Sequence, residues 1–289
     1  MAKPAAPKSH PLLTEGRMVL MPGVFDPLSA KLAERAGFPA VFVSGYALAA
    51  SHLGVPDFGL LTQTDLVAAV RRITAAVKVG VVVDGDTGYG GPLNVQKLVR
   101  ELRSAGAMGV VLEDQTWPKR CGHMRGKSVI DAGEHAAKLR AAADARDGER
   151  FIITARTDAL ETDGMDEALR RARLYKEAGA DVLFVEGPRS REELELIGKE
   201  LPPPLAVNLV DGGNTPHFSL EELEEMGFFS VGFVVSGLYA SAAALERTYR
   251  HLLEHGSTEA LGESMMGFDE FNDMIGVESF YAKDERYKT

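Results

Sequence analysis

The sequence has almost no cysteine: Cys121 is the only one among 289 residues. One cysteine cannot form an internal disulfide, so the fold needs no oxidising compartment. No apolar run approaches the roughly 20 residues that span a bilayer, and the Ala/Pro/Lys-rich segment 1–17 lacks the apolar core of a signal peptide. We therefore expect a cytoplasmic protein, without a membrane partner, that begins with a flexible N-terminal arm at 1–17.

Basic charge is also scarce. Lys and Arg total 32 against 42 Asp and Glu, which gives a net charge of −10 at pH 7. A nucleic-acid-binding protein needs a basic surface that displaces counterions from phosphates, so this balance argues against a nucleic-acid partner. The hydrophobic share of 45% is ordinary for a globular protein, and the length suits one α/β barrel domain.

One phrase repeats along the chain: an amphipathic helix pattern, a glycine, and then a short apolar run. It occurs around Gly37, Gly106, Gly179 and Gly227. Each glycine stands where the end of a helix favours a left-handed residue. Each following run is apolar on both faces and rich in small branched residues, which is typical of a parallel strand covered by helices.

Eight such strand and helix units alternate, which predicts an α/β protein folded as a (β/α)₈ TIM barrel. An open, doubly wound sheet is the alternative, but no G-x-G-x-x-G follows the first strand. The predicted strands lie near 18–22, 40–44, 80–84, 109–113, 151–156, 181–186, 205–208 and 230–235. The predicted helices lie near 27–36, 63–77, 92–105, 133–146, 165–178, 190–200, 219–226 and 237–254.

A further helical stretch, roughly 259–275, follows the eighth unit and has no place in the ring of helices. We expect it to pack elsewhere, on another subunit. The predicted domain organisation is therefore the arm at 1–17 and one barrel domain at 18–289, which includes a C-terminal helical extension at about 256–289.

Acidic residues follow neighbouring predicted strands. Asp84 and Asp86 end the third strand, Glu113 ends the fourth, and Asp57 lies in the loop after the second. The carboxyl ends of barrel strands meet at one rim, where clustered carboxylates repel one another or require a cation. Oxygen ligands of this kind suit Mg²⁺ or Mn²⁺. The alternative is that individual acids cap the helices that begin there.

The segment 115–127 after the fourth strand has no apolar periodicity and holds Lys119, Arg120, Cys121 and His123 within five residues. A thiol beside three basic groups is predicted to have a lowered pKa and to serve as a proton donor or nucleophile. The alternative is a solvated basic loop with an incidental cysteine. Its glycines and its length suit a lid over bound substrate.

Together these motifs resemble the isocitrate lyase and phosphoenolpyruvate mutase superfamily over essentially the whole chain after Met18. The most specific motif is Lys119-Arg-Cys-Gly-His123, which is similar to the lyase signature of that superfamily. Within the superfamily, the phrases VSGYALAASHLGVPDFGLLT, WPKRCGHMRGK and EFNDMIGVESFY look like those of the 2,3-dimethylmalate lyase and oxaloacetate hydrolase group. Further matching motifs are Ser44-Gly45-Tyr46, Gly54-Val-Pro-Asp57, Asp84-Gly-Asp86, Glu113-Asp114-Gln115 and Ala155-Arg-Thr-Asp158.

The resemblance implies bound Mg²⁺ (or Mn²⁺), held by Asp84 directly and by Asp57, Asp86 and Glu113 partly through water. It also implies a set of residues that hold or line the site of a small dicarboxylate substrate: Ser44, Gly45, Tyr46, Gly122, His123, Arg156, Glu186 and Asn208. The implied catalytic candidates are Cys121, Lys119, His123, Tyr46, Arg156 and Glu186.

The activity implied is a carbon–carbon lyase that cleaves a 2-hydroxy dicarboxylate of the substituted malate or methylisocitrate type. Its products are a 2-oxo acid and a carboxylate, formed through an enolate that Cys121 protonates. The resemblance also implies a helix exchanged between subunits and a homotetramer built as a dimer of dimers.

Several alternatives stay open at this point: an oxaloacetate hydrolase or decarboxylase, a phosphonate mutase acting on a P–C bond, and an inactive barrel that serves as a binding scaffold. Tyr239 stands near the place where methylisocitrate lyases of the superfamily carry Arg, which argues against a tricarboxylate substrate. Val234 stands near the place where oxaloacetate hydrolases carry Ser, which weakens that alternative.

Overall fold

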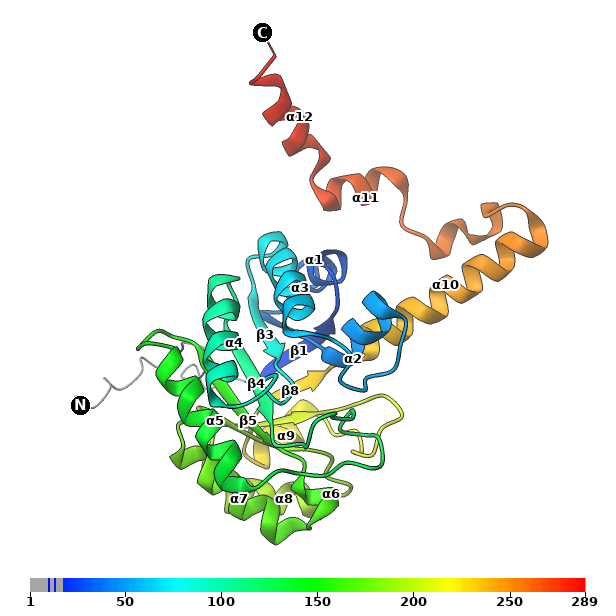
Figure 1. The fold of residues 1–289 in the computed structure, drawn as a ribbon. Coiled ribbons are helices and arrows are strands. Elements are labelled where there is room, and N and C mark those ends of the chain that lie inside the picture. The colour runs from blue at the N-terminus through cyan, green and yellow to red at the C-terminus, as the bar shows by residue number, and fades with distance from the viewer. Residues whose placement is uncertain (1–9, 11–12, 14–17, 289) are drawn as a thin grey trace. The chain divides into compact units, whose positions relative to one another are not determined.

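The computed structural model describes His10, Leu13 and residues 18–288. Apart from those two residues, the predicted arm at 1–17 lies outside the described part of the chain. Eight parallel strands close into a barrel in sequence order, and the eighth pairs with the first (Figure 1). The strands are β1 Val19–Val24, β2 Ala40–Val43, β3 Gly80–Asp84, β4 Gly109–Glu113, β5 Ile152–Thr157, β6 Val182–Val185, β7 Leu205–Asn208 and β8 Phe228–Phe233. The predicted TIM barrel is confirmed.

Alternate residues of each strand serve two different cores. In β3, Val81 and Val83 pack in the layer between strands and helices, whereas Val82 belongs to the cluster inside the barrel. In β4, Val111 likewise faces the interior. Both faces are buried, which explains why these strands read as continuous apolar runs.

Helices cover the outside of the barrel (Figure 1). Several begin at an N-terminal cap; for example, the Asp26 side chain caps α1, with Pro27 in its first turn. Gly106 and Gly179 adopt positive φ angles of 89° and 108° after α4 and α7. The helices are α1 Pro27–Arg35, α2 Gly45–Leu48, α3 Gln63–Ala76, α4 Pro92–Ser104, α5 Ala132–Ala145, α6 Ala159–Thr162, α7 Met165–Glu177, α8 Arg191–Glu200, α9 Leu220–Glu225, α10 Ser236–His255, α11 Phe268–Ile275 and α12 Val277–Glu285.

The C-terminal part differs from the prediction of one helix at 259–275. A 3₁₀ segment, Glu259–Ser264, is followed by α11, and the tail beyond it forms α12. Gly267 precedes α11 and Gly276, with φ +86°, separates α11 from α12, because a left-handed residue ends a helix. The short helices α2 and α6 and the π-helical turn Ala49–Leu53 were also not predicted.

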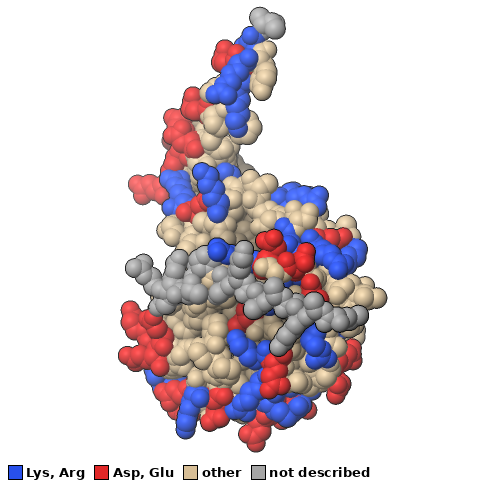
Figure 2. Space-filling view, turned by 90° about the vertical axis from the view of Figure 1, so that its left-hand side faces the viewer, with Lys and Arg blue, Asp and Glu red and all other residues tan. Residues whose placement is uncertain are grey.

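The described chain falls into two compact units, one ending at Leu238 and one starting at Tyr239. No residue of α10, α11 or α12 is buried. Among the described residues, no helix is long and apolar enough to cross a membrane. On the face that Figure 2 presents, acidic and basic side chains are interspersed.

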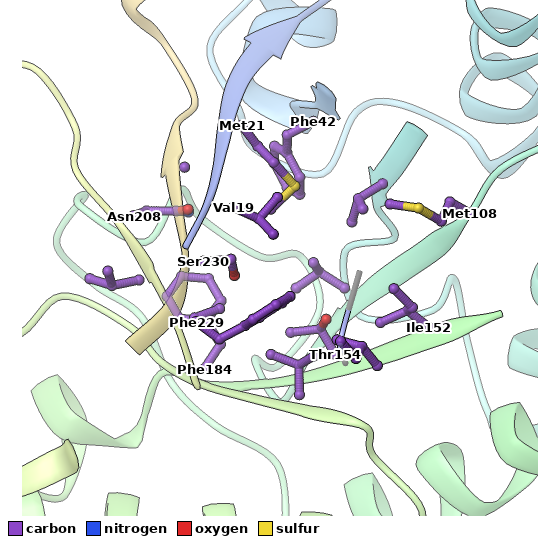
Figure 3. Close-up of a pocket in the computed structure, with 17 residues that line it drawn as sticks. Val19, Met21, Phe42, Met108, Ile152, Thr154, Phe184, Asn208, Phe229 and Ser230 are labelled. Carbon is purple, nitrogen blue, oxygen red and sulfur yellow. The ribbon is translucent and has the colours of Figure 1, made fainter. Parts of the chain in front are cut away.

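The interior of the barrel is apolar and nearly filled. Side chains from different strands, among them Met21, Phe42, Ile152 and Phe184, surround a cavity of about 50 Å³ (Figure 3). Asn208, at the end of β7, contributes one of the few polar side chains that line this cavity. The barrel is therefore a packed core, and its polar chemistry is confined to the carboxyl-terminal rim.

Candidate active site

The rim of the barrel gathers the polar residues that follow the strands. Asp84 and Glu113 are the last residues of β3 and β4, and Glu113 is paired in register with Arg156 of β5. None of Asp84, Asp86 and Glu113 caps a helix, because α4 begins after Gly91 and α5 begins after Asp131. The capping interpretation of these acids is therefore wrong.

Lys119 enters this group of acids from the loop after β4. Its Nζ lies 2.7 Å from Asp57 Oδ2 and 2.6 Å from Asp86 Oδ1, and all three side chains are buried. Burial raises the pKa of Asp86 to about 6, with Asp84 and Asp57 adding to the shift against the opposing effect of Lys119. Burial also raises the pKa of Glu113 well above its usual range. Lys119 contacts two of the four neighbouring carboxyl groups, those of Asp57 and Asp86.

The acid cluster (Asp57, Asp84, Asp86 and Glu113) fits a hard cation by its chemistry. Glu113 Oε1 is buried without a hydrogen-bond partner, and burial raises the pKa values of Asp86 and Glu113, so a bound cation would favour their charged forms. Within residues 18–288, however, no three His, Cys, Asp or Glu side chains form a ready ligand set. The Lys119 ammonium contacts oxygens of both Asp57 and Asp86.

Arg156 forms the positive counterpart beside the acid cluster. Asp158 receives two hydrogen bonds from it, at 2.9 and 3.0 Å, and Glu113 and Glu186 each approach to 3.5 Å. Burial alone would raise the pKa of Asp158, but Arg156 and Lys127 lower it to about 2. These contacts fix the orientation of the planar Arg156 guanidinium beside the acid cluster, and bidentate recognition of a carboxylate requires such a fixed orientation.

His123 bridges two rim loops. Its Nε2 lies 3.1 Å from Glu186 Oε1, and its Nδ1 accepts a hydrogen bond from the backbone N–H of Asn214 at 3.0 Å. An accepting Nδ1 assigns the proton of the neutral ring to Nε2, which faces Glu186 Oε1. The imidazole is therefore oriented by both the β6 end and the loop after β7.

The predicted lid loop (residues 115–127) is docked on the rim. Its base is fixed by Gln115, whose amide donates to the carbonyl of Arg120 and accepts from its N–H. The Arg120 guanidinium lies 4.2 Å from the centre of the Phe58 ring. Gly122 packs so closely that a Cβ there would lie 2.4 Å from both Arg156 Nη2 and Glu186 Oε1. Only glycine permits this approach.

The pKa predicted for Cys121 was wrong in direction. Burial, with further contributions from Asp57 and Glu186, raises the pKa of the thiol to about 11 and outweighs Arg156 and the His123 backbone. The basic neighbours in sequence point elsewhere: Lys119 to the acids, Arg120 to Phe58 and His123 to Glu186. The group is therefore a protonated thiol at neutral pH, which suits a proton donor.

Other predicted residues lie around this centre. Gly45 N–H donates to Asp84 Oδ2 at 3.3 Å, Ser44 caps α2, and Tyr46 packs against the apolar cluster inside the barrel. The sequence reasoning gave no role to Tyr89, whose hydroxyl donates to Asp86 Oδ2 at 3.2 Å. The location of Tyr89, three residues beyond Asp86, was the available signal.

A second buried group supports the rim from behind. Asp114 accepts hydrogen bonds from the Thr157 hydroxyl at 2.7 Å, the Tyr175 hydroxyl at 2.8 Å, the Asp158 N–H at 2.9 Å and Arg171 at 3.2 Å. These contacts tie the ends of β4 and β5 to α7. Nothing in the sequence pointed to Arg171 or Tyr175, because both lie in an ordinary amphipathic helix.

Comparison with known proteins extends this description. A family model described as phosphoenolpyruvate phosphomutase matches residues 10–253. The chain is 51% identical to the petal death protein of Dianthus caryophyllus, over 96% of this chain and 88% of that protein. It is 41% identical to 2,3-dimethylmalate lyase of Eubacterium barkeri, over 98% of each.

Solved structures agree with these sequence matches. A crystal structure of 2,3-dimethylmalate lyase, described as a PEP mutase/isocitrate lyase superfamily member, superposes with a TM-score of 0.90 at 35% identity. The match covers 95% of this chain and 92% of that one. Phosphonopyruvate hydrolase in complex with oxalate and Mg²⁺ gives a TM-score of 0.86 at 28% identity, with 96% of both chains covered.

Proposed function

The chain belongs to the PEP mutase/isocitrate lyase superfamily, and on that premise we propose that it is a metal-dependent carbon–carbon lyase acting on a substituted malate. The observation that carries the proposal is the thiol of Cys121. Burial keeps it protonated, and the adjoining Gly122 packs directly on the Arg156–Glu186 pair beside the acid cluster. A proton donor in that position suits a reaction that ends by protonating a carbanion.

The substrate's carboxylates would be held by groups that the rim already orients. Arg156 offers a planar guanidinium fixed by Asp158, and His123 would complete the anion-binding side together with Ser44, Gly45 and Tyr46 at the start of α2. Asp84, Asp86, Asp57 and Glu113 would hold Mg²⁺ or Mn²⁺, which supplies Lewis-acid stabilisation of the 2-oxygen and a template for the carboxylate when bound.

The chain's own residues would carry the proton transfers. Tyr46 or a carboxylate of the acid cluster accepts the proton of the 2-hydroxyl, and the C2–C3 bond breaks. Its electron pair passes to the departing carboxylate fragment as an enolate, while C2 becomes the 2-oxo carbon. Arg156 stabilises the developing negative charge, and Cys121 delivers its proton to the carbanion carbon. The docked lid loop keeps bulk water away from the enolate.

The first experiment is a screen for Mg²⁺-dependent release of a 2-oxo acid from 2-methyl-, 2-ethyl- and 2,3-dimethylmalate, methylisocitrate and oxaloacetate. Wild type is compared with Cys121→Ser, with and without EDTA. We expect turnover of a malate that EDTA abolishes and that the variant reduces by about 10²- to 10⁴-fold, as for loss of a general acid. Product from the variant at the wild-type rate would overturn the role of the thiol.

An oxaloacetate hydrolase or decarboxylase and a phosphonate mutase are the rival activities within the superfamily. Neither a decarboxylase nor a mutase needs a thiol that protonates carbon. Oxaloacetate turnover that survives the Cys121 change would therefore favour a decarboxylase. Absence of turnover on every compound, with metal bound, would favour the phosphonate chemistry or an inactive scaffold.

We also propose a homo-oligomer, a tetramer built as a dimer of dimers, in which the extension after the barrel supplies contacts between subunits. The absence of buried residues in α10, α11 and α12 supports this, since these helices carry large apolar side chains such as Tyr249 and Phe271. We propose the cytoplasm as the place of action, because a functional free thiol suits a reducing compartment; cell fractionation tests this.

A further inference from the structure

Lys127 is a buried cation at the far end of the lid loop to which the proposed reaction gives no role. Only 1% of its side chain is exposed. Its Nζ donates to Asp158 Oδ1 at 3.0 Å and pairs with Glu161 Oε2 at 2.8 Å. The same ammonium donates to the carbonyl oxygen of Gly122, five residues back along the loop. All three of its donors are thus directed at identified oxygens.

Lys127 does more than form ion pairs, because it also binds the backbone carbonyl of Gly122 in the lid loop. Gly122 is held from its Cα side by Arg156 and Glu186, against which even one added carbon would clash. Lys127 holds the same residue from its carbonyl side. Gly122 is therefore packed against Arg156 and Glu186 on one side and held at its carbonyl by Lys127 on the other.

We propose that Lys127 is a positioning residue, which locks the Cys121–Gly122–His123 segment of the lid loop over the rim by joining the Gly122 carbonyl to Asp158 and Glu161. Three side chains of the lid loop then contact the rim. Lys119 contacts the acid cluster, His123 contacts Glu186, and Lys127 contacts the start of α6. Only the last of these contacts lies outside the proposed substrate site.

Asp158 shows why the arrangement is suited to locking without being needed for folding. Arg156 already satisfies Asp158 through two hydrogen bonds, and the backbone N–H of Asp158 is bound by Asp114. Removing the Lys127 ammonium therefore leaves no unpaired buried carboxylate at this position. What is lost is the connection between the barrel and the Gly122 carbonyl.

The test uses the single cysteine as its reporter. The alkylation rate of Cys121 by iodoacetamide at pH 8 is compared in Mg²⁺-loaded wild type, Lys127→Met and Arg125→Met. Arg125 is the matched control, an exposed cation in the same loop. We expect alkylation to become about 10- to 100-fold faster in Lys127→Met. When the loop is no longer docked, the Cys121 thiol is exposed to solvent and its pKa returns to the ordinary value of a thiol. The Arg125 variant should react at the wild-type rate.

A positioning role also predicts a particular kinetic pattern. The inference rests on the proposed lyase only for this readout: kcat of Lys127→Met should fall about tenfold or more while KM changes less than about threefold. Glu161→Gln, which leaves Asp158 in place, should show a smaller change in the same direction. If wild type turns over none of the substrates, the proposed function fails but the alkylation comparison still decides the role of Lys127.

The outcome that overturns the inference is alkylation of Lys127→Met at the wild-type rate together with an unchanged kcat. Thermal melts of each variant guard against global unfolding, which would accelerate alkylation without any specific effect on the lid. If Lys127→Met does not fold, the Glu161→Gln variant carries the test, and a wild-type alkylation rate in that variant contradicts the proposal.

Discussion

At the scale of single residues, the Cys121 thiol is controlled by the place where the lid loop holds it. Burial raises its pKa to about 11. A raised pKa means that the neutral thiol persists to higher pH in the folded protein than in the unfolded chain. The residue therefore has a proton to give throughout the physiological range.

This predicts the pH dependence of Cys121 alkylation. Between pH 8 and 10 the rate in native protein should rise about tenfold per pH unit without levelling, because only the thiolate reacts and its fraction stays small. In 8 M urea the same curve should level near the ordinary thiol pKa of roughly 8.5. A native curve that levels below pH 8 would contradict the protonated thiol and favour a nucleophile.

His135 gives a second prediction at this scale. It is fully buried on α5, edge-on to Tyr175, and burial, with Lys138 adding to it, lowers its pKa to about 3. Between pH 6.5 and 3, His135 is therefore protonated in the unfolded chain but neutral in the native protein. Stability is present above pH 6.5 and is lost as the pH falls through this window.

His135→Leu should remove that loss. Urea unfolding at pH 7 and at pH 4.5 should show a smaller drop in the free energy of unfolding for the variant than for wild type. The difference should approach about 1.4 kcal/mol per pH unit within the window. Equal drops in both proteins would show that His135 does not titrate on unfolding as proposed.

At the scale of elements, α7 is fixed to the strand ends through Asp114, which accepts hydrogen bonds from both Arg171 and Tyr175 of that helix. Arg171 donates to Asp114 and to the carbonyl of Ile130, which stands just beyond the lid loop. Arg170, its neighbour, is bound only to Glu167 at the surface. Arg171 thus connects α7 to the end of β4 and to the chain just beyond the lid loop.

The two arginines make a matched pair of variants. Arg171→Met should lower the free energy of unfolding by about 3–5 kcal/mol, because it leaves a buried carboxylate with one partner fewer. Arg170→Met should cost less than about 1 kcal/mol, as for an exposed pair. Guanidinium denaturation of both variants measures this, and equal losses would show that the Asp114 contact has no special weight.

At the scale of the whole molecule, the described chain consists of a barrel unit and a smaller C-terminal unit. The barrel has its own apolar interior and its own outer core. The helices after residue 238 bury none of their residues, although Tyr249 is 63% exposed and Phe268 82% exposed. Apolar surface of this kind is usually covered by another protein surface.

Sedimentation equilibrium should therefore give a mass close to four times 31.2 kDa for the native protein. Tyr249→Asp should shift the protein toward smaller species, because burying an unpaired charge in an interface costs several kcal/mol. Glu246→Gln on the same exposed helix should leave the mass unchanged. A monomeric wild type, or a Tyr249→Asp variant with the wild-type mass, would contradict the proposed interface.

The sequence by itself determined the barrel. Periodicity, helix caps and the glycines after each helix are local signals, and the predicted boundaries of all eight strands and of α1, α3–α5 and α7–α10 agree with the structure to within two residues. The strand ends also identified Asp84, Glu113 and Arg156, since parallel strands bring their carboxyl ends to one rim. The C-terminal helices were less accurate, because glycine breaks there compete with an amphipathic pattern.

Only the tertiary structure decided the chemistry of the groups. In sequence, Cys121 stands beside basic residues, which predicts a lowered pKa. In the fold, Lys119 and His123 contact other partners, and burial raises the pKa of the thiol instead. Lys127 pairs with Asp158 at a separation of 31 residues, and Asp114 binds Thr157 and Arg171 at separations of 43 and 57 residues. A pKa depends on desolvation and on charges close in space, and neither quantity is encoded in the order of neighbouring residues.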